Sequence, residues 1–294
     1  MKASAFAYQR ATSVDNALEL LGAYGERAKV LSGGQSLMPA MNLRLIAPDL
    51  IVDIGGLAEL QGVALQGTIL RMGALTRHVE ILGSPQIAVA APLLREAVAH
   101  IAHPAIRNRG TIGGSLAHAD PAAELPACML VLNGTFVARG PGGERRISAA
   151  HFFRGIFQTA LAADELLIAI ELPVVREGSA HFFHEFARRH GDFAIAGLAA
   201  QAVVAGGVFA DLRMGFFGVG DRPALALAAN RLVGAAVTPG LLADVSNALG
   251  EELDPHEDQQ ASAAMRRHLA KILLARCVAA LLRRPELNAK GGVA

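Results

Sequence analysis

The sequence contains two short glycine-rich stretches, Ser32-Gly33-Gly34-Gln35-Ser36 and Thr111-Ile112-Gly113-Gly114-Ser115. Each follows a segment that we expect to be a strand or an extended loop. Glycine has no Cβ, so its backbone N–H can approach an anion closely, and a neighbouring hydroxyl adds a further donor. Two such loops together predict a cradle for the pyrophosphate of a dinucleotide. Taken alone, either loop is also compatible with an ordinary turn.

Other well-known phosphate-binding patterns are absent from the sequence. It has no G-x-x-x-x-G-K-[ST] loop, which argues against nucleoside triphosphate hydrolysis. The nearest G-x-G triplet is Gly218-Val219-Gly220, and it runs into Asp221-Arg222-Pro223 with no third glycine and no opening helix. A Rossmann dinucleotide site is therefore not expected either.

Length and composition bound the class of protein. A chain of 294 residues can bury a large core and has the length of two domains, or of one domain in two parts. Hydrophobic residues make up 52% of it, yet no apolar run reaches the roughly 18 residues that a membrane span needs. The N-terminus has no apolar export signal, so we expect a soluble, cytoplasmic protein. A net charge of +1 without a basic block gives no footprint for nucleic acid.

Cysteine and histidine do not indicate a metal centre in this chain. The two cysteines, Cys128 and Cys277, lie far apart, whereas an iron–sulfur cluster normally takes four thiolates. An iron–sulfur centre that serves this protein must therefore lie on another chain. Two histidine pairs have the spacing of a helix face, but neither has the carboxylate of an H-E-x-x-H motif: His100 with His103, and His181 with His184. We assign no metal to them.

The first 56 or so residues are expected to form a small β-α-β unit. Ser13 caps an amphipathic helix that ends near Gly25, and the strand Lys29-Val30-Leu31 delivers the first glycine loop. A second, buried strand covers Leu50 to Ile54. Beyond it, we expect strands at 62–65, 69–73, 136–138, 145–147 and 165–172, and helices at 76–83, 86–101 and 122–132.

The last part of the chain has a different pattern and follows a linker at 174–178. Strands at 199–204 and 208–217 flank a glycine turn, and helices follow at about 223–233, 239–249 and 257–283. Paired antiparallel strands followed by helices indicate a separate α+β domain. The residues from Asn288 to Ala294 are expected to be disordered.

The second glycine loop lies in a longer segment of unusual composition, from Ile106 to Pro126. Two acids, Asp120 and Glu124, follow the loop. Such a segment can bind a diphosphate on its glycine side and sugar or ribityl hydroxyls on its carboxylate side. Asp120 can equally be a helix N-cap, since Pro121 suits the first turn of a helix.

Two segments carry a resemblance to a known family. They are Leu31-Ser32-Gly33-Gly34-Gln35-Ser36-Leu37-Met38-Pro39 and Arg107-Asn108-Arg109-Gly110-Thr111-Ile112-Gly113-Gly114-Ser115-Leu116-Ala117-His118-Ala119-Asp120-Pro121. With them, the chain closely resembles the FAD-binding medium subunits of molybdenum hydroxylases, the family of carbon monoxide dehydrogenase and the xanthine dehydrogenases. The likeness covers nearly the whole chain, because the strand at 164–173, the segment at 186–194 and the closing helices also look like that family's.

The resemblance implies an α+β fold in two domains. A vanillyl-alcohol-oxidase-type (PCMH-type) FAD-binding domain would occupy residues 1–175, in two parts of about 1–56 and 57–175. A carbon monoxide dehydrogenase flavoprotein C-terminal domain, with a three-stranded antiparallel sheet and helices, would occupy residues 178–287. No histidine or cysteine stands out as a covalent anchor, so non-covalent FAD is expected.

The same resemblance implies where FAD is bound. Residues 30–37 and 111–115 would hold the diphosphate, Asp120 and Glu124 the ribityl or ribose part, and Ile101 the adenine side. Leu167 or Ile168 and the segment at 188–193 would lie near the flavin. The implied contacts are Val30, Leu31, Ser32, Gly33, Gly34, Gln35, Ser36, Leu37, Ile101, Thr111, Ile112, Gly113, Gly114, Ser115, Ala117, His118, Asp120, Glu124, Leu167, Ile168 and Phe193. None is assigned as catalytic.

Two positions depart from the family's pattern. Relatives often have a lysine just before the double-arginine segment, where this chain has His184-Glu185. They often have an aromatic residue with a hydroxyl or an indole after Gly-Asp, where this chain has Phe193. Phenylalanine covers a flavin face but makes no hydrogen bond there. Arg188 and Arg189 fit surface or interface charges as well as they fit a cofactor contact.

The function implied by the resemblance is electron transfer within a three-subunit enzyme. Molybdenum on a large subunit oxidises the substrate, and [2Fe-2S] clusters on a small subunit pass electrons to this FAD, which delivers them to an external acceptor. A dimer of such heterotrimers is expected. The alternatives are a self-contained flavin oxidase of small molecules and a nucleotide-binding module that has lost its flavin. The sequence does not distinguish carbon monoxide, aldehydes, purines and other nitrogen heterocycles as substrates, nor does it identify the acceptor.

Overall fold

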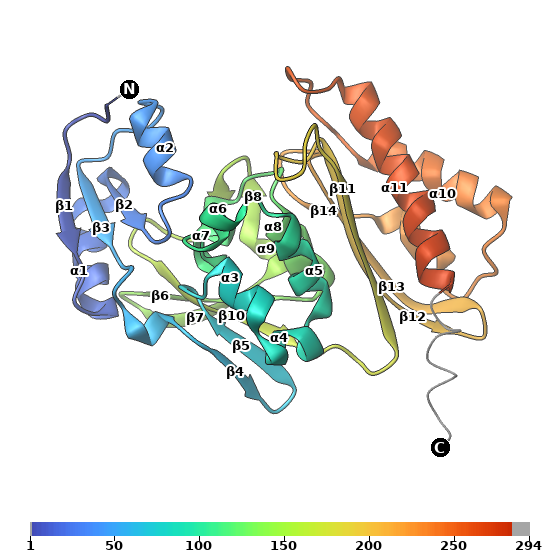
Figure 1. Cartoon of the computed structure of the whole chain (residues 1–294), viewed down its shortest axis with the longest axis horizontal. Coiled ribbons are helices and arrows are strands. Elements are labelled where there is room, and N and C mark those ends of the chain that lie inside the picture. Colours follow the sequence, from blue (N-terminus) through green and yellow to red (C-terminus); the bar gives the residue numbers. More distant parts are fainter. Residues whose placement is uncertain (1, 284–294) are drawn as a thin grey trace.

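A computed structural model describes residues 2–283 of the chain and places them in three successive regions. Figure 1 shows a small sheet near the N-terminus, a larger sheet with a group of helices beside it, and a C-terminal sheet covered by two long helices. The larger sheet and its helices lie between the other two regions (Figure 1).

The N-terminal region is a three-stranded parallel sheet in the order β1 (Ala7–Arg10), β3 (Leu50–Asp53), β2 (Ala28–Leu31). Helix α1 (Val14–Tyr24) begins where predicted, because the Ser13 side chain accepts a hydrogen bond from the Asn16 N–H at 3.1 Å. Gly25 ends it and opens a short 3-10 helix, Gly25–Arg27. Strand β1 was not predicted, because all four of its residues are exposed and show no alternation.

The middle region has an antiparallel sheet in the order β4-β5-β10-β6-β7. Its strands are β4 (Val63–Gln66), β5 (Ile69–Gly73), β10 (Leu166–Pro173), β6 (Thr135–Gly140) and β7 (Gly143–Ser148). Because β10 comes last in the chain but pairs with both β5 and β6, it closes the sheet around the residues between them. The five strands agree with those predicted from the sequence, apart from their ends.

The helices of the middle region differ from the prediction, which did not include the short helices at 58–60, 104–107 and 149–152. The helix expected at 86–101 is two helices, α4 (Pro85–Ala90) and α5 (Pro92–His100), because Pro92 cannot continue a helix and Ala91 has a non-helical φ of −147°. The second glycine stretch is not a free loop, because α7 (Ile112–His118) begins inside it. The remaining helices are η2 (Ala58–Leu60), α3 (His78–Gly83), α6 (Pro104–Arg107), α8 (Glu124–Val131) and α9 (Ala149–Phe152), with a small hairpin of β8 (Phe153–Gly155) and β9 (Gln158–Thr159).

The C-terminal region contains a four-stranded antiparallel sheet, in place of the three strands expected. Its order is β11 (Ser179–Phe186), β12 (Ala196–Ala205), β13 (Val208–Phe217) and the two-residue β14 (Ala224–Leu225). The helix expected at 223–233 is β14 followed by a 3-10 helix, Leu227–Leu232. Helices α10 (Pro239–Glu252) and α11 (Ala263–Arg283) are present, although α11 starts six residues later than predicted. The predicted disorder of residues 288–294 lies outside the described residues.

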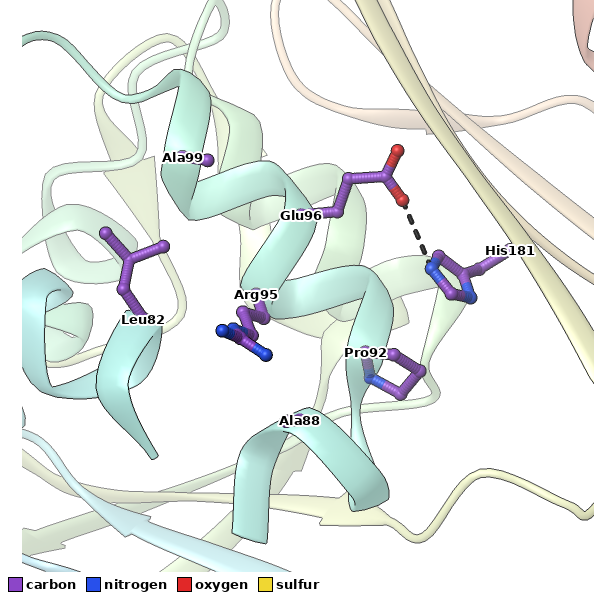
Figure 2. Close-up of a pocket in the computed structure, with 7 residues that line it drawn as sticks. All are labelled: Leu82, Ala88, Pro92, Arg95, Glu96, Ala99 and His181. Carbon is purple, nitrogen blue, oxygen red and sulfur yellow. Dashed lines mark ion pairs between the residues drawn. The ribbon is translucent and has the colours of Figure 1, made fainter. Parts of the chain in front are cut away.

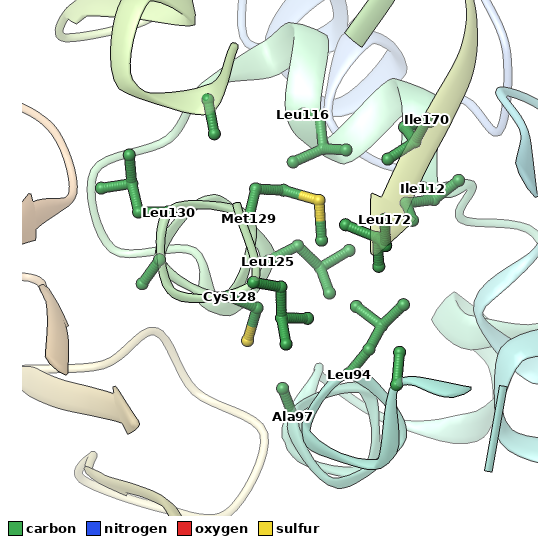
Figure 3. Packing of buried hydrophobic residues seen from close by; sticks show 14 of the residues in the cluster. Leu94, Ala97, Ile112, Leu116, Leu125, Cys128, Met129, Leu130, Ile170 and Leu172 are labelled. Atoms are coloured by element: carbon green, nitrogen blue, oxygen red, sulfur yellow. The ribbon is translucent and has the colours of Figure 1, made fainter. Parts of the chain in front are cut away.

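Helix α8 lies at the centre of the molecule, and all eight of its residues are buried. Figure 3 shows it end-on, with α5, α7 and β10 around it. The C-terminal sheet packs on its other side, where Gly215 on β13 leaves room for Val131, and Arg213 donates hydrogen bonds to the carbonyls of Leu130 and Val131. Phe183 and Phe217 of the C-terminal sheet belong to the same buried cluster as α8. The two larger regions therefore share a core.

Leu125 on α8 is fully buried in this core, so its truncation is expected to be costly. We expect Leu125→Ala to lower the free energy of unfolding by about 2–5 kcal/mol, measured by urea denaturation. Leu65→Ala is the matched control, because Leu65 is 52% exposed on β4, and it should change stability by less than about 0.5 kcal/mol. Equal effects of the two substitutions would contradict the burial of α8.

Candidate functional site

The first glycine stretch is a loop between β2 and α2 (Leu37–Asn42). Val30 and Leu31 end the strand, and Leu37 is the first residue of the helix. Among the described residues, no hydrogen bond uses the backbone N–H of Gly33, Gly34, Gln35 or Ser36. Buried or half-buried N–H groups in proteins normally have partners. A run of four without one indicates a place for an external acceptor.

The second glycine stretch is held in place by a short antiparallel bridge. The His78 N–H donates to the Gly110 carbonyl, and the Ile112 N–H donates to the Thr76 carbonyl, both at 2.9 Å. Thr111 is buried and caps α7, since its hydroxyl accepts a hydrogen bond from the Gly114 N–H at 3.1 Å. The stretch is therefore rigid before any ligand binds.

The two stretches touch each other. The hydroxyls of Ser32 and Thr111 form a hydrogen bond of 2.7 Å. A Cβ added to Gly33 would clash with the Arg109 carbonyl oxygen and lie 2.9 Å from the Gly110 Cα. A Cβ at Gly113 would lie 2.6 Å from the Ala74 carbonyl oxygen. Glycine is thus required at both stretches because backbone meets backbone there.

A polar cavity of about 270 Å³ opens between the two stretches. Arg77 and Arg109 line this cavity, and neither was among the predicted contacts. Among the described residues, neither arginine takes part in an ion pair. Arg109 stands inside the 107–121 segment, whereas Arg77 belongs to no motif and is brought here by the bridge to Thr111. The full lining is Ser32, Gly33, Gly55, Gln61, Leu75, Arg77, Glu80, Arg109 and Thr111. Free donors and free cations together fit a diphosphate.

Strand β10 lies directly behind the second stretch. The Ala74 N–H donates to the Ile168 carbonyl at 3.0 Å, and the Gly113 N–H donates to the Ala74 carbonyl at 2.9 Å. Leu167 and Ile168 are buried on β10 beside a register shift in its pairing with β6. These two bonds link Ile168 to the second glycine stretch through Ala74, a residue that the prediction did not include.

The other predicted residues form a second group. Ile101 follows α5 and is nearly buried, and its carbonyl accepts a hydrogen bond from Arg107 at 2.8 Å. Gly191, in the segment after β11, lies against Ala102, where a Cβ would come within 2.5 Å of the Ala102 carbonyl oxygen. Phe193, two residues later, is 61% exposed. This contact brings the 187–193 segment beside the residues that follow α5.

The two acids after α7 have different environments. Asp120 accepts a hydrogen bond from the Ala122 N–H at 2.9 Å and so caps a turn, but α8 begins only at Glu124, with Ala123 as its N-cap. The helix-cap alternative for Asp120 is therefore wrong. Burial, together with the charge of the Glu185 carboxylate, raises the pKa of Glu124 to about 8. Ala117 is exposed on α7, and His118 stacks on Phe157 with ring centres 4.8 Å apart.

The histidine pairs do not form helix-face sites. His103 lies beyond the end of α5, and His181 and His184 are on strand β11, where three residues of separation place them on opposite faces. Among residues 2–283, no group of three or more His, Cys, Asp or Glu side chains is arranged to hold a metal ion. No helix in the same range is long and apolar enough to cross a membrane.

Two family models match the chain, one over the N-terminal and middle regions together and one over the C-terminal region. Residues 4–175 match the family model "FAD binding domain in molybdopterin dehydrogenase", and residues 181–281 match "CO dehydrogenase flavoprotein C-terminal domain". The chain is 38% identical to 6-hydroxypseudooxynicotine dehydrogenase complex subunit alpha of Paenarthrobacter nicotinovorans, over 97% of each chain. It is 37% identical to caffeine dehydrogenase subunit beta of a Pseudomonas species, over 95% of each.

A solved structure supports the same relationship. The chain superposes on a chain of carbon monoxide dehydrogenase from Hydrogenophaga pseudoflava with a TM-score of 0.93 and 34% identity. The match covers 96% of this chain and 98% of the other. The described residues therefore share the fold of this relative.

The buried Glu124 makes stability dependent on pH. Its pKa is about 8 in the folded protein, above the ordinary value of 4.5, so the folded state holds its proton over a range in which the unfolded chain loses it. The stabilising effect is complete below about pH 4.5 and is lost as the pH rises towards 8. We expect the free energy of unfolding to fall across this range, with a contribution from Glu124 of up to about 1.4 kcal/mol per pH unit.

Urea denaturation of the wild type and of Glu124→Gln from pH 5 to pH 8 checks this, because the variant cannot titrate at this position. Burial lowers the pKa of His78 to about 4, which acts in the opposite direction, but it acts equally in both proteins. The difference between the two proteins in the slope of unfolding free energy against pH therefore measures the titration of Glu124. Parallel curves would show that Glu124 is not held protonated.

Proposed function

This chain belongs to the family of FAD-binding medium subunits of molybdenum hydroxylases, and on that premise we propose how it holds FAD and works within its complex. It is an FAD-carrying oxidoreductase subunit of a multi-subunit enzyme, and the partner subunits carry the molybdenum cofactor and the iron–sulfur clusters. Bound FAD supplies the ability to collect electrons singly and to release them in pairs. The residues of this chain bind and orient it.

The observation that carries the proposal is a first glycine stretch with four unpartnered N–H groups, from Gly33 to Ser36, that touches the second stretch through the Ser32–Thr111 hydrogen bond. We assign the FAD diphosphate to the backbone N–H groups of Gly33 to Ser36 and to the start of α7 at Thr111 to Ser115. The Ser32–Thr111 hydrogen bond fixes the spacing between the two stretches, and Arg77 and Arg109 supply positive charge beside them. The second stretch is already held by its bridge to Thr76 and His78, which limits the entropic cost of binding.

The remaining contacts are assigned along the cofactor from these stretches. Ile101 lies on the adenine side, and Asp120 and Glu124 face the ribityl or ribose hydroxyls, with Glu124 able to donate a hydrogen bond as a neutral acid. Leu167, Ile168 and Phe193 pack against the ring system, and Phe193 contributes apolar cover only. Val30, Leu31, Leu37, Ala117 and His118 complete the site. FAD is held without a covalent bond.

The domain limits that we propose are 1–175 for FAD binding and 178–287 for the C-terminal domain. The matched family segments, 4–175 and 181–281, support a boundary between β10 and β11. The shared core around α8 explains why the two domains hold one arrangement.

In the complex, we assign this subunit the transfer of electrons from [2Fe-2S] clusters to an external acceptor, within a cytoplasmic dimer of heterotrimers. The large subunit selects the reducing substrate, which agrees with relatives whose names range from caffeine to carbon monoxide dehydrogenases. The self-contained oxidase is not favoured, because the similarity to medium subunits extends over both domains.

Gly33→Ala tests the diphosphate site. The added Cβ would meet the Arg109 backbone and push the two stretches apart, so FAD affinity should fall by at least about tenfold, or ~1.4 kcal/mol. Affinity is measured by titrating the FAD-depleted protein with FAD and following flavin fluorescence. The control is Gly22→Ala on α1, where a Cβ meets no atom within 4 Å. Unchanged affinity in Gly33→Ala would place the diphosphate elsewhere.

Co-expression with the two partner chains tests the assembly. Light scattering of the purified complex should give the mass of two copies of each of three chains. A single heterotrimer would contradict the proposed dimer, and a stable chain that oxidises a small molecule alone would favour the self-contained oxidase.

A further inference from the structure

Strand β11 of the C-terminal domain lies along helix α5 of the FAD-binding domain. Its residues alternate, as strand residues do, with Phe182 and Phe186 packed into the C-terminal core and His181, Phe183 and Glu185 on the other face. Helix α5 presents Glu96 and His100, one helical turn apart, to that face. We call this contact between α5 and β11 the domain seam.

Two histidine–carboxylate pairs cross the domain seam, one with its acid on α5 and the other with its acid on β11. Glu96 Oε2 of α5 lies 3.2 Å from His181 Nε2 of β11, and His100 Nδ1 of α5 lies 3.7 Å from Glu185 Oε1 of β11. Figure 2 shows the Glu96–His181 pair bridging the helix and the strand. Each domain therefore supplies one acid and one base to the domain seam.

The domain seam runs from solvent into the protein. At its outer end, a cavity of about 450 Å³ is lined by Leu82, Ala88, Pro92, Arg95, Glu96, Ala99 and His181 (Figure 2). His100 is 30% exposed, whereas the Glu185 side chain is only 5% exposed. Among the described residues, Glu185 Oε2 has no hydrogen-bond partner. The Glu96–His181 pair is thus the outer pair, which solvent reaches. The His100–Glu185 pair is the inner pair, and it contains the buried carboxyl whose Oε2 has no hydrogen-bond partner among the described residues.

The groups around Glu185 suit a carboxyl that gains and loses a proton near neutral pH. From α5 it faces His100, whose ring centre is 6.0 Å from that of the exposed His190 in the segment after β11, and from α8 its charge acts on Glu124 and Cys128. On its own sheet it pairs with Gly197. Burial raises the pKa of Glu185 to about 7, and burial and the charge of His190 lower the pKa of His100.

The domain seam ends beside the residues assigned to FAD, so a role for it in flavin chemistry rests on the proposed function. Glu185 is the second-last residue of β11, and the segment that carries Phe193 follows that strand. Gly191 of this segment touches Ala102, which is next to Ile101. Glu124, whose charge couples to that of Glu185, follows Asp120 on the ribityl side. We therefore expect a change of charge on the flavin to change the affinity of the Glu185 carboxyl for a proton.

We propose that Glu185, with His100, is a positioning and proton-loading site that takes up a proton from water when the flavin is reduced. Iron–sulfur clusters deliver two electrons and no proton. Two electrons and one proton on bound FAD would leave one added negative charge, and the Glu185 carboxylate would balance it by binding a second proton from water to become a carboxylic acid. When the acceptor removes two electrons and the flavin proton, Glu185 returns its proton to water through His100 and the outer pair.

The experiment is a redox titration of bound FAD in the assembled complex from pH 6 to pH 8, because the slope of midpoint potential against pH counts protons per electron. The wild type should take up more protons per flavin than Glu185→Gln, by roughly half a proton near pH 7. Glu251→Gln, an exposed acid on α10, is the matched control and should titrate as the wild type does. FAD content measured in each sample tests the proposed function separately.

Infrared difference spectra of the oxidised and reduced complex give a second measurement, which observes the carboxyl group directly. A protonated carboxyl band should grow on reduction near pH 7 and be absent in Glu185→Gln. Equal potential slopes in samples that retain FAD, or no carboxyl change in the wild type, would overturn the proposal. A wild-type complex without FAD would instead contradict the proposed function.

Discussion

The close approach of two pieces of backbone determines the geometry of the candidate site. Gly33 lies against Arg109 and Gly110 with no room for a side chain, and the Ser32 and Thr111 hydroxyls join the two stretches beside that contact. The first stretch is positioned by a parallel sheet of the N-terminal region, and the second by a bridge to Thr76 and His78 in the middle region. The N-terminal and middle regions must therefore pack in one relative position for the donors to converge, and glycine at position 33 makes that position sterically accessible.

The third region contributes in a different way, through the core around α8. A helix whose residues are buried on every side must be covered on every side, and the C-terminal sheet supplies the missing cover. Arg213 at the same time donates hydrogen bonds to the carbonyls of Leu130 and Val131 at the C-terminal end of α8. The same arrangement has the segment after β11 lying against Ala102, although the two are far apart in sequence.

Sequence patterns predicted those elements whose signals are local. The Ser13 cap, the apolar strand β10 and the glycine hairpin between β12 and β13 all fall where expected. Patterns that depend on tertiary contacts were missed: β1 is exposed throughout, and Arg77 reaches the candidate site only through its pairing with Thr111. The helical spacing of His181 and His184 was misleading, because three residues of separation have a different meaning on a strand. Which residues contact the cofactor was inferred from family resemblance, since spacing alone does not reveal which loops will meet.

Two carboxyl groups, Glu124 and Glu185, are buried where α5, α8 and β11 meet, although burying an acid opposes folding. The same burial raises the pKa of Glu124 to about 8 and that of Glu185 to about 7, because desolvation disfavours the charged form. Apolar side chains would join the domains without the desolvation cost of a buried carboxyl, as Phe183 and Phe217 do. A buried acid that titrates near neutral pH gains or loses a proton when charge appears nearby, and a cofactor that gains and loses electrons creates such charge. The position of these acids is thus better explained by electron transfer than by stability.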